Sequence, residues 1–310
     1  MFDMDVSSHQ TANTSSAPSA LPTNPSSQVV YLNGSLVARA NAKVDIEDRG
    51  FMFADGVYEV IRYYNGKPLA MDEHVKRLTR SLEAVRINAP DMLANIHQAT
   101  DQLVQANGLS HASVYWQITR GSAPRNHTIP SNIRPTCMAI AYKAHDLRQE
   151  TSPRCVSASI EPDMRWSRCD IKSLMLLANV LTKDTANQQG CYEAILHRDN
   201  IITEGCSTSV LAVMDGVIHT HPANQWILDS ITRRIILKLA DELGIKVVQT
   251  PLTINQLAAA DEIMLAGTTT HLAAVTHLNG QPMGHGKAGL VTSKLFSALR
   301  EYIFRQCPMP

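Results

Sequence analysis

The stretch RWSRCDIKSLMLLANVLTKDTANQQGCYEAILHRDNIITEG, residues 165–205, decides how the rest of the chain is interpreted. It places one lysine, Lys172, before an apolar helical run, and one carboxylate, Glu204, in a Thr-Glu-Gly segment. A cofactor with an aldehyde and a basic ring nitrogen needs this pair, because the amine binds the aldehyde and the carboxylate keeps the nitrogen protonated. A lysine before a helix is usually a solvated cation, so the pair gains weight only from the rest of the chain.

Composition excludes several classes of function. The 310 residues are 44% hydrophobic and 18% charged, which is typical of a globular protein with one or two domains. The formal net charge is zero and no apolar run approaches about 20 residues, so we expect neither a nucleic-acid partner nor a membrane span. Six scattered cysteines without a CxxC pair favour the reducing cytoplasm. The twelve histidines show no HxxxH or HExxH spacing, so no metal site is predicted.

Changes in composition along the chain predict its organisation. Residues 1–28, rich in Ser, Thr, Ala, Pro and Asn, are expected to form a disordered extension. Residues 29–144 predict an α+β N-terminal domain, and the polar stretch 145–153 predicts a linker. The order of elements in residues 154–310 predicts a second domain with a strongly curved sheet. We therefore expect an α+β protein of two domains with a cleft between them.

Local signals predict the hairpins and helices. Hairpins are expected at four dipeptides, with a type I′ signal at the first two: Asn33-Gly34, Asn65-Gly66, Asp215-Gly216 and Asn279-Gly280. Helices are expected at 73–85 with Asp72 as cap, 92–105, 174–189 with Ser173 as cap, 231–243 after Asp229 and Ser230, and 291–305.

Three segments offer donors for anions. Residues 228–234 combine a helix start with a hydroxyl and positive charge, which suits a phosphate. The Gly267-Thr268-Thr269-Thr270 run, which follows a predicted strand, adds donors of the same kind. In the loop Arg125-Asn-His127, two side chains spaced by one residue can converge on a carboxylate. Each segment, taken alone, is also explained as a helix start or loop that contacts only water.

Together, these segments resemble the fold-type IV pyridoxal-phosphate aminotransferases, and most of all the bacterial enzymes that act on D-amino acids such as D-alanine. The resemblance covers nearly all of residues 29–305. It is carried, in family order, by EDRGFMFADGVYEVIRYYNGKP, DEHVKRL, QITRGSAPRNHTIP, RWSRCDIKSL, GCYEAILHR, ITEG, THPANQWILDSITR and AGTTT.

The resemblance implies a fold and a cofactor site. It implies a small α/β N-terminal domain and a larger C-terminal domain with a barrel-like sheet, with pyridoxal 5′-phosphate in the cleft. Lys172 would bind the aldehyde covalently and shuttle the α-proton, while Glu204 would face the ring nitrogen. The remaining cofactor contacts would come from Arg77, the backbone amides of Ile231 and Thr232, Thr268, and Leu228 on a ring face.

The resemblance also implies the substrates. The reaction would be transamination between a D-amino acid and a 2-oxo acid such as 2-oxoglutarate. Tyr58 would help to position the substrate carboxylate, and Glu59 would support the site near the lysine. Arg125 and His127 would reach the active site of a neighbouring subunit, so the chain is expected to form a homodimer.

Departures from the family pattern leave alternatives open. Cys206 and Ser209 stand in a segment where the family commonly has a serine-rich run ending in asparagine, and Gly267 stands where a serine is usual. The alternatives within the fold are a branched-chain L-aminotransferase, an R-selective amine transaminase and an aminodeoxychorismate lyase. A further alternative is a cofactor-free binding or regulatory protein that has kept the scaffold.

Overall fold

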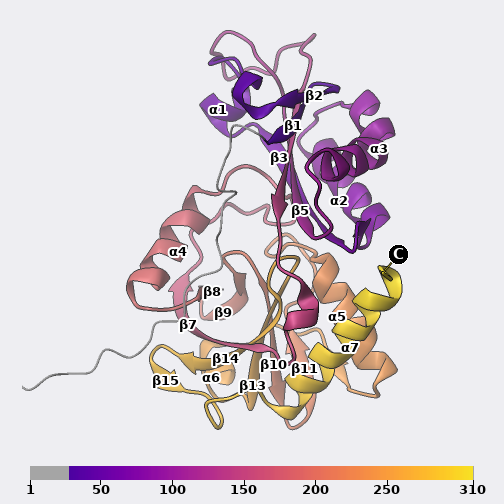
Figure 1. Cartoon of the computed structure of the whole chain (residues 1–310). Coiled ribbons are helices and arrows are strands. Elements are labelled where there is room, and N and C mark those ends of the chain that lie inside the picture. The colour runs from indigo at the N-terminus through magenta and orange to yellow at the C-terminus, as the bar shows by residue number, and fades with distance from the viewer. Residues whose placement is uncertain (1–27, 310) are drawn as a thin grey trace, which may run out of the picture.

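The computed structural model describes residues 28–309, which are arranged as two lobes around two β-sheets (Figure 1). Apart from Gln28, the extension expected at residues 1–28 lies outside the described residues. Gln28 is buried, and its side-chain amide donates a hydrogen bond to the Ala141 carbonyl. Among residues 28–309, no helix has the length and apolar character that crossing a bilayer requires.

The first lobe contains a six-stranded sheet in which every neighbouring pair is antiparallel. Its strand order is β2-β1-β6-β5-β3-β4. The strands are β1 (Val29–Leu32), β2 (Ser35–Ala38), β3 (Gly56–Tyr64), β4 (Lys67–Pro68), β5 (Ala112–Thr119) and β6 (Thr136–Lys143). Burial alternates along β5, as expected where one face of a sheet is covered by helices.

Two helices cover that face: α2 (Met71–Ala84) and α3 (Pro90–Ala106). Leu78 of α2 and Ile96 of α3 are fully buried, and they belong to the same core as Ile61 and Trp116 of the sheet. A short helix, α1 (Arg49–Phe53), precedes β3. The face of β3 and α2 that is turned toward the second lobe carries part of the site described below.

The second lobe contains a nine-stranded, curved sheet. Its order is β12-β11-β10-β13-β14-β7-β8-β9, and β15 pairs with β14. The pairs β14·β7, β7·β8 and β11·β12 are parallel, and the other pairs are antiparallel. The strands are β7 (Arg154–Pro162), β8 (Glu193–Arg198), β9 (Ile201–Gly205), β10 (Ser209–Met214), β11 (Val217–Thr220), β12 (Val247–Val248), β13 (Glu262–Gly267), β14 (His271–Leu278) and β15 (Gln281–Pro282).

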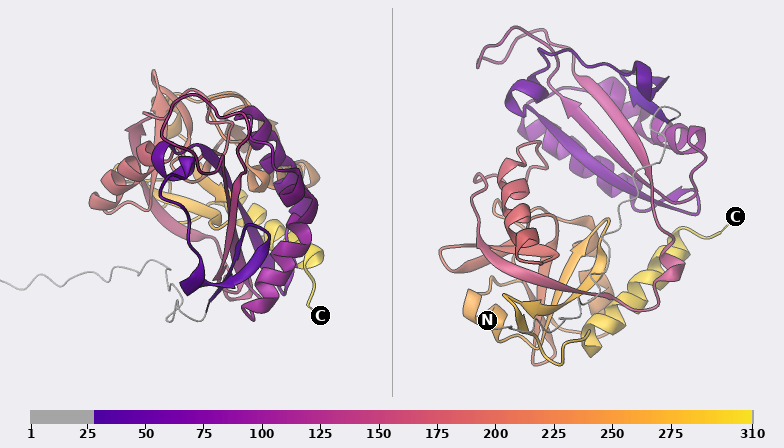
Figure 2. Two further views of the ribbon diagram at one scale, coloured as in Figure 1. Left: turned by 90° about the horizontal axis from the view of Figure 1, so that it is seen from above. Right: turned by 60° about the vertical axis from the view of Figure 1, so that its left-hand side comes forward.

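Apolar clusters lie on both faces of this sheet. On one face, α5 (Ile231–Glu242) and α7 (Leu290–Gln306) pack against β10, β13 and β14. The short α6 (Ile254–Ala258) contributes to the cluster on the other face. The helix α4 (Leu177–Gln188) lies beside β8, at the side of the second lobe near the first (Figure 2). Because both faces are covered, strands such as β10 and β13 are almost continuously apolar.

Links between the lobes include the β3–β4 hairpin and residues 144–153. The tip of the β3–β4 hairpin reaches the second lobe, where Tyr64 joins the core of α5 and α7 and the Asn65 side chain donates to the Cys307 carbonyl. Residues 144–153 run from β6 to β7 and contain a 3-10 turn at Leu147–Gln149. Leu147 is buried in the core of the second lobe, so this connection is fixed along part of its length.

Local predictions succeed at the turns. In all four predicted hairpins both central residues have positive φ, as type I′ turns require. The helix starts are less accurate: α2 begins at Met71 with Ala70 as N-cap, and α4 begins only at Leu177. Neither Asp72 nor Ser173 caps a helix, so those two expectations are wrong.

Candidate active site

A cavity of about 220 Å³ lies between the lobes. It is lined by β3 and α2 of the first lobe and by the segment before α4, the β9–β10 turn, the start of α5 and the end of β13. Six of the residues predicted for the site line this one cavity: Tyr58, Arg77, Lys172, Glu204, Leu228 and Thr268.

Lys172 is held by pairing of its backbone with β3. Its carbonyl accepts a hydrogen bond of 2.9 Å from the Tyr58 N–H, and Ser173 forms an antiparallel bridge with Val57. The Lys172 Nζ lies 4.2 Å from the centre of the Tyr58 ring, and it forms no ion pair with any residue between 28 and 309. The amine is therefore available in the cavity instead of being neutralised by a carboxylate.

Glu204 lies near the end of β9 and is only 5% exposed. Its carboxylate accepts a hydrogen bond of 2.6 Å from Arg165 Nη1, and the Leu228 N–H lies 3.1 Å from both of its oxygens. Burial raises the pKa of Glu204, while Arg165 and the Leu228 N–H oppose that rise. Asp163 in turn pairs with Arg165 at 2.8 Å, so two successive ion pairs fix the position of the Glu204 carboxylate.

Arg165 and Asp163 were not predicted as site residues. Arg165 lines the cavity, and its guanidinium is held by both Asp163 and Glu204. Its only signal in the sequence was its place in the RWSRC segment, because Asp163 and Glu204 are brought together only by the fold.

Arg77 projects from α2 and is held by a buried carboxylate. Its Nε and Nη2 donate to the two oxygens of Glu59 at 2.9 and 2.6 Å, and His74 Nδ1 lies 3.0 Å from the same carboxylate. Burial opposes ionisation of Glu59, but Arg77 and His74 outweigh it and hold its pKa far below the usual range. Arg77 Nη1 also donates to the Asp229 carbonyl at 3.3 Å, so the guanidinium lies beside the start of α5.

The start of α5 and the turn after β13 complete an anion-binding region. Ser230 caps α5 by accepting a hydrogen bond from the Arg233 N–H, and Ile231 and Thr232 occupy the first two helical positions. N–H groups at these positions have no partner within a helix. Ser230 and Thr268 line the main cavity, whereas Ile231 and Thr232 line an adjoining hollow that also includes Thr268.

These donors fit pyridoxal 5′-phosphate. A free amine, a buried carboxylate and an anion-binding region with Arg77 match its aldehyde, its ring nitrogen and its phosphate. In addition, Ser209 belongs to the cavity wall, and its buried hydroxyl has no hydrogen-bond partner among the described residues.

The departures from the family pattern also lie in the cavity wall. Burial raises the pKa of Cys206 to about 12, so this thiol is protonated at neutral pH and is not a nucleophile. A Cβ added at Gly267 would meet no atom closer than 3.6 Å, so the backbone has room there for the usual serine.

The predicted substrate residues Arg125 and His127 do not line this cavity. Both are exposed, and both pack around Phe53 of α1: the Arg125 guanidinium lies 5.3 Å and the His127 ring 5.5 Å from the Phe53 ring. Within a single chain the structure therefore brings together six predicted residues and leaves these two outside.

Comparison with known proteins agrees with this geometry. Residues 56–278 match the family model described as Amino-transferase class IV. A D-alanine aminotransferase of Listeria monocytogenes is 40% identical over 280 residues, covering 90% of this chain and 97% of that protein. One from Staphylococcus epidermidis is 39% identical over 275 residues, covering 88% and 97%.

Solved structures resemble the fold. A branched-chain amino acid aminotransferase from T.th., solved with pyridoxamine 5′-phosphate, superposes with a TM-score of 0.83 at 25% identity, covering 91% of this chain and 95% of that one. The branched-chain enzyme of Escherichia coli gives 0.79 at 25% identity, covering 89% and 93%. The match of the family model over most of the chain, the similar relatives and the shared architecture lead to one conclusion: this chain belongs to the class IV aminotransferase family.

Proposed function

We propose that this protein is a pyridoxal-phosphate-dependent aminotransferase that exchanges the amino group of a D-amino acid, such as D-alanine, with a 2-oxo acid such as 2-oxoglutarate. The observation that carries the proposal is the convergence of Lys172, Glu204 and Arg77 on one cavity. The choice of D-amino acids is supported by the relatives of 39% and 40% identity, which are D-alanine aminotransferases.

Pyridoxal phosphate supplies an aldehyde that binds the amino group and a conjugated ring that accepts the electron pair left by the α-proton. Lys172 Nζ, free of any carboxylate partner in the described chain, holds the cofactor and carries the proton to and from the α-carbon. Glu204 keeps the ring nitrogen protonated, and its contacts with Arg165 and Leu228 fix it in place. Leu228, which lines the cavity, would pack against one face of the ring.

The phosphate is assigned to the other end of the cavity. Arg77 supplies charge, and the N–H groups of Ile231 and Thr232 and the hydroxyl of Thr268 supply donors. Because Glu59 orients Arg77 through two hydrogen bonds, Glu59 acts as a positioning residue for the phosphate site.

The substrate carboxylate is assigned to Tyr58, Arg125 and His127, the last two from the second subunit of a homodimer. Two observations support the dimer. The loop with Arg125 and His127 is exposed in its own chain. In addition, α4 and the residues before it expose an apolar strip: Met175, Leu177, Val180 and Leu181. Apolar strips of this kind are typical of interfaces.

We further propose a cytoplasmic location and a division into two domains. The six cysteines are all unpaired, as expected in a reducing compartment. The division at residues 145–153 is supported by the two separate sheets, with residues 29–144 and 154–310 as the domains.

The test is a spectrophotometric assay with D-alanine and 2-oxoglutarate, run beside L-alanine and the L-branched-chain amino acids. The proposal requires turnover with the D-enantiomer and little with the L-enantiomers. The branched-chain activity, suggested by the fold of the solved neighbours, requires the reverse. A protein without cofactor absorbance, even after addition of pyridoxal phosphate, would overturn both.

The decisive variant is Lys172→Ala. Because a positioned proton-transfer group contributes about 10²–10⁴-fold, transamination should fall by at least about 10²-fold, while the cofactor still binds through its phosphate. Dialysis and absorbance measure cofactor retention separately from turnover. Near-normal turnover in this variant would contradict the assigned role of the lysine.

A further inference from the structure

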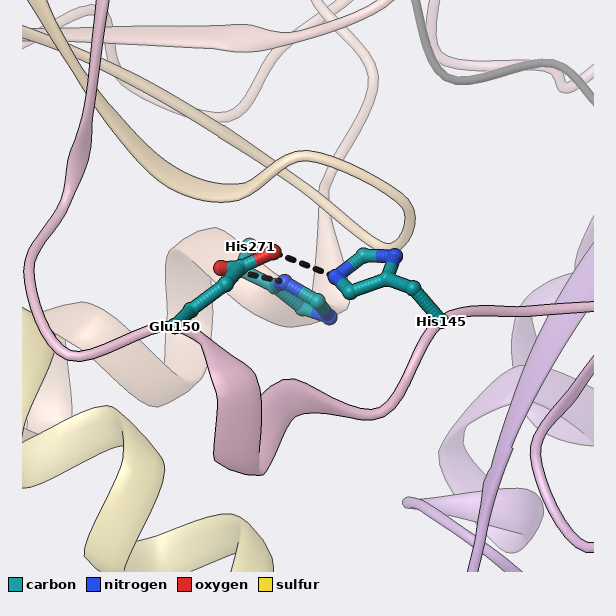
Figure 3. Close-up of side chains that lie close together, drawn as sticks. All are labelled: His145, Glu150 and His271. Atoms are coloured by element: carbon teal, nitrogen blue, oxygen red, sulfur yellow. Dashed lines mark ion pairs between the residues drawn. The ribbon is translucent and has the colours of Figure 1, made fainter.

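Three side chains from two distant parts of the chain point toward one another: His145, Glu150 and His271 (Figure 3). His145 and Glu150 belong to residues 144–153, which join the two lobes, and His271 is the first residue of β14. Their nearest nitrogen and oxygen atoms all lie within 4.8 Å of one another. One Glu150 oxygen pairs with His145 Nε2, and the other lies 3.6 Å from His271 Nδ1.

His271 is the inner member of this cluster. It is only 3% exposed, and its Nδ1 has no hydrogen-bond partner among the described residues. A buried ring nitrogen without a partner is costly, so its presence indicates that the nitrogen has another use. The opposite nitrogen, Nε2, lies 2.7 Å from the Tyr64 hydroxyl. Such a second contact fixes the orientation and tautomer of histidines that bind metals.

The charges around the cluster suit a divalent cation with nitrogen ligands. Glu150 supplies one negative charge next to two imidazoles. Arg62 is a cation close enough to act on His271, and its guanidinium donates to the Ser113 hydroxyl and the His145 carbonyl and lies over the Tyr64 ring.

We propose that His145, Glu150 and His271 form a binding site for a transition metal of the Zn²⁺ class. Two imidazoles and one carboxylate are a ligand set that Zn²⁺ commonly takes, with a fourth position for water. Tetrahedral coordination requires ligand atoms about 3.3 Å apart. The Glu150 oxygen beside His271 Nδ1 lies 3.6 Å from it, close to that spacing.

The expectation of no metal site rested on the spacing of histidines in the sequence. That spacing could not reveal this cluster, because β14 brings His271 beside a segment more than a hundred residues earlier in the chain. A metal here would tie the connection between the lobes to the first residue after the Gly267–Thr270 turn. Since Thr268 of that turn lines the active-site cavity, the metal would stabilise both the lobe connection and the wall of the cavity.

The test uses Co²⁺ as the probe, added to untagged full-length holoenzyme without substrate. Four-coordinate Co²⁺ has visible bands at longer wavelengths than the cofactor absorbs, so the two signals are separable. The proposal requires one Co²⁺ per chain, displacement of Co²⁺ by Zn²⁺, and loss of the bands in His145→Ala and Glu150→Gln. The matched control is His97→Ala, which removes an exposed histidine 3.5 Å from Asp72.

Two further measurements separate a metal site from an ion-paired triad. Tyr64→Phe removes the hydroxyl beside His271 and should weaken Co²⁺ binding by about tenfold, as is usual for outer contacts of a metal site. The melting temperature of wild-type protein should rise with Zn²⁺ concentration, and that of Glu150→Gln should not. Co²⁺ bands of equal strength in all variants, or wild-type melting that ignores Zn²⁺, would overturn the proposal.

Discussion

Glu59 is a fully buried carboxylate whose charge is balanced by Arg77, and it also accepts a hydrogen bond from His74. Replacing it with glutamine keeps the shape but leaves two N–H-bearing groups without their anion. We expect Glu59→Gln to lower the free energy of unfolding of the apoprotein by about 3–5 kcal/mol at neutral pH, since breaking a buried pair costs that much. Denaturant titration measures the change.

The pH dependence of this loss has a defined sign. The folded state lowers the pKa of Glu59 from its ordinary 4.5, so the stabilisation is complete above pH 4.5 and is lost as the pH falls below it. The difference between wild type and Glu59→Gln should therefore shrink in acid. A difference that stays constant from pH 7 to below pH 4 would show that the glutamine acts through packing instead of charge.

Replacing Gly267, in the turn after β13, is expected to strengthen binding of the cofactor. The space around its Cβ position allows Gly267→Ser, which adds one hydroxyl to the proposed phosphate site. Because one net hydrogen bond contributes about 1 kcal/mol, the affinity for pyridoxal phosphate should rise about fivefold. Equilibrium binding to apoenzyme measures the rise, with Thr268→Val as the opposite change, which should weaken binding. Unchanged affinity in both variants would mean that the phosphate lies elsewhere.

At the scale of residues, sequence reasoning identified groups that belong to short motifs. Lys172, Glu204 and Arg77 were found in this way, and the structure places them around one cavity. Arg165 was missed because its importance depends on contacts with Asp163 and Glu204, which no local pattern encodes. The buried Nδ1 of His271 was invisible for the same reason.

At the scale of elements, α4 carries the next prediction. Leu177, Val180 and Leu181 are 71%, 59% and 55% exposed. If the proposed dimer covers them, Val180→Asp buries an unpaired carboxylate at the interface. That costs about 2 kcal/mol or more, so the dissociation constant should rise at least about 30-fold. Analytical ultracentrifugation measures the shift, with Gln188→Glu on the same helix as control. A variant that remains as associated as wild type would place the interface elsewhere.

Elements with local signals were predicted well, and elements defined by distant partners were not. Asn-Gly and Asp-Gly dipeptides adopt positive φ by their own preference, so all four hairpins were found. The strand β7 was missed. It pairs in parallel with β14 across more than a hundred residues, and no turn signal marks the two strands as neighbours. The late start of α4 follows from the pairing of Ser173 with Val57, which draws the preceding residues onto β3.

At the scale of the whole molecule, each active site of the proposed dimer contains residues from both chains, because Arg125 and His127 of one chain reach the cavity of the other. The Lys172→Ala and Arg125→Ala variants should each have low transaminase activity alone. Arg125→Ala should lose activity through a higher KM for substrates with an α-carboxylate. A mixed dimer of the two contains one site in which both residues are intact. Equal amounts, unfolded and refolded together, should recover roughly a quarter of wild-type activity, because half of the dimers are mixed and each has one intact site.

This recovery is measured with D-alanine against each variant refolded alone. A mixture no more active than the sum of its components would show that Arg125 serves the cavity of its own chain, or no cavity.

The contact between the tip of the β3–β4 hairpin and the last helix has a practical consequence. Asn65 is bonded to the Cys307 carbonyl, and Tyr64 is buried among residues of the last helix, so the final turns of the chain help to hold the lobes together. Affinity handles, fluorescent fusions and surface tethers are often attached to the carboxyl end. In this protein, such an attachment would place mechanical load on the contact between the hairpin tip and the last helix. A biosensor or immobilised catalyst made from this protein is therefore better attached at another position.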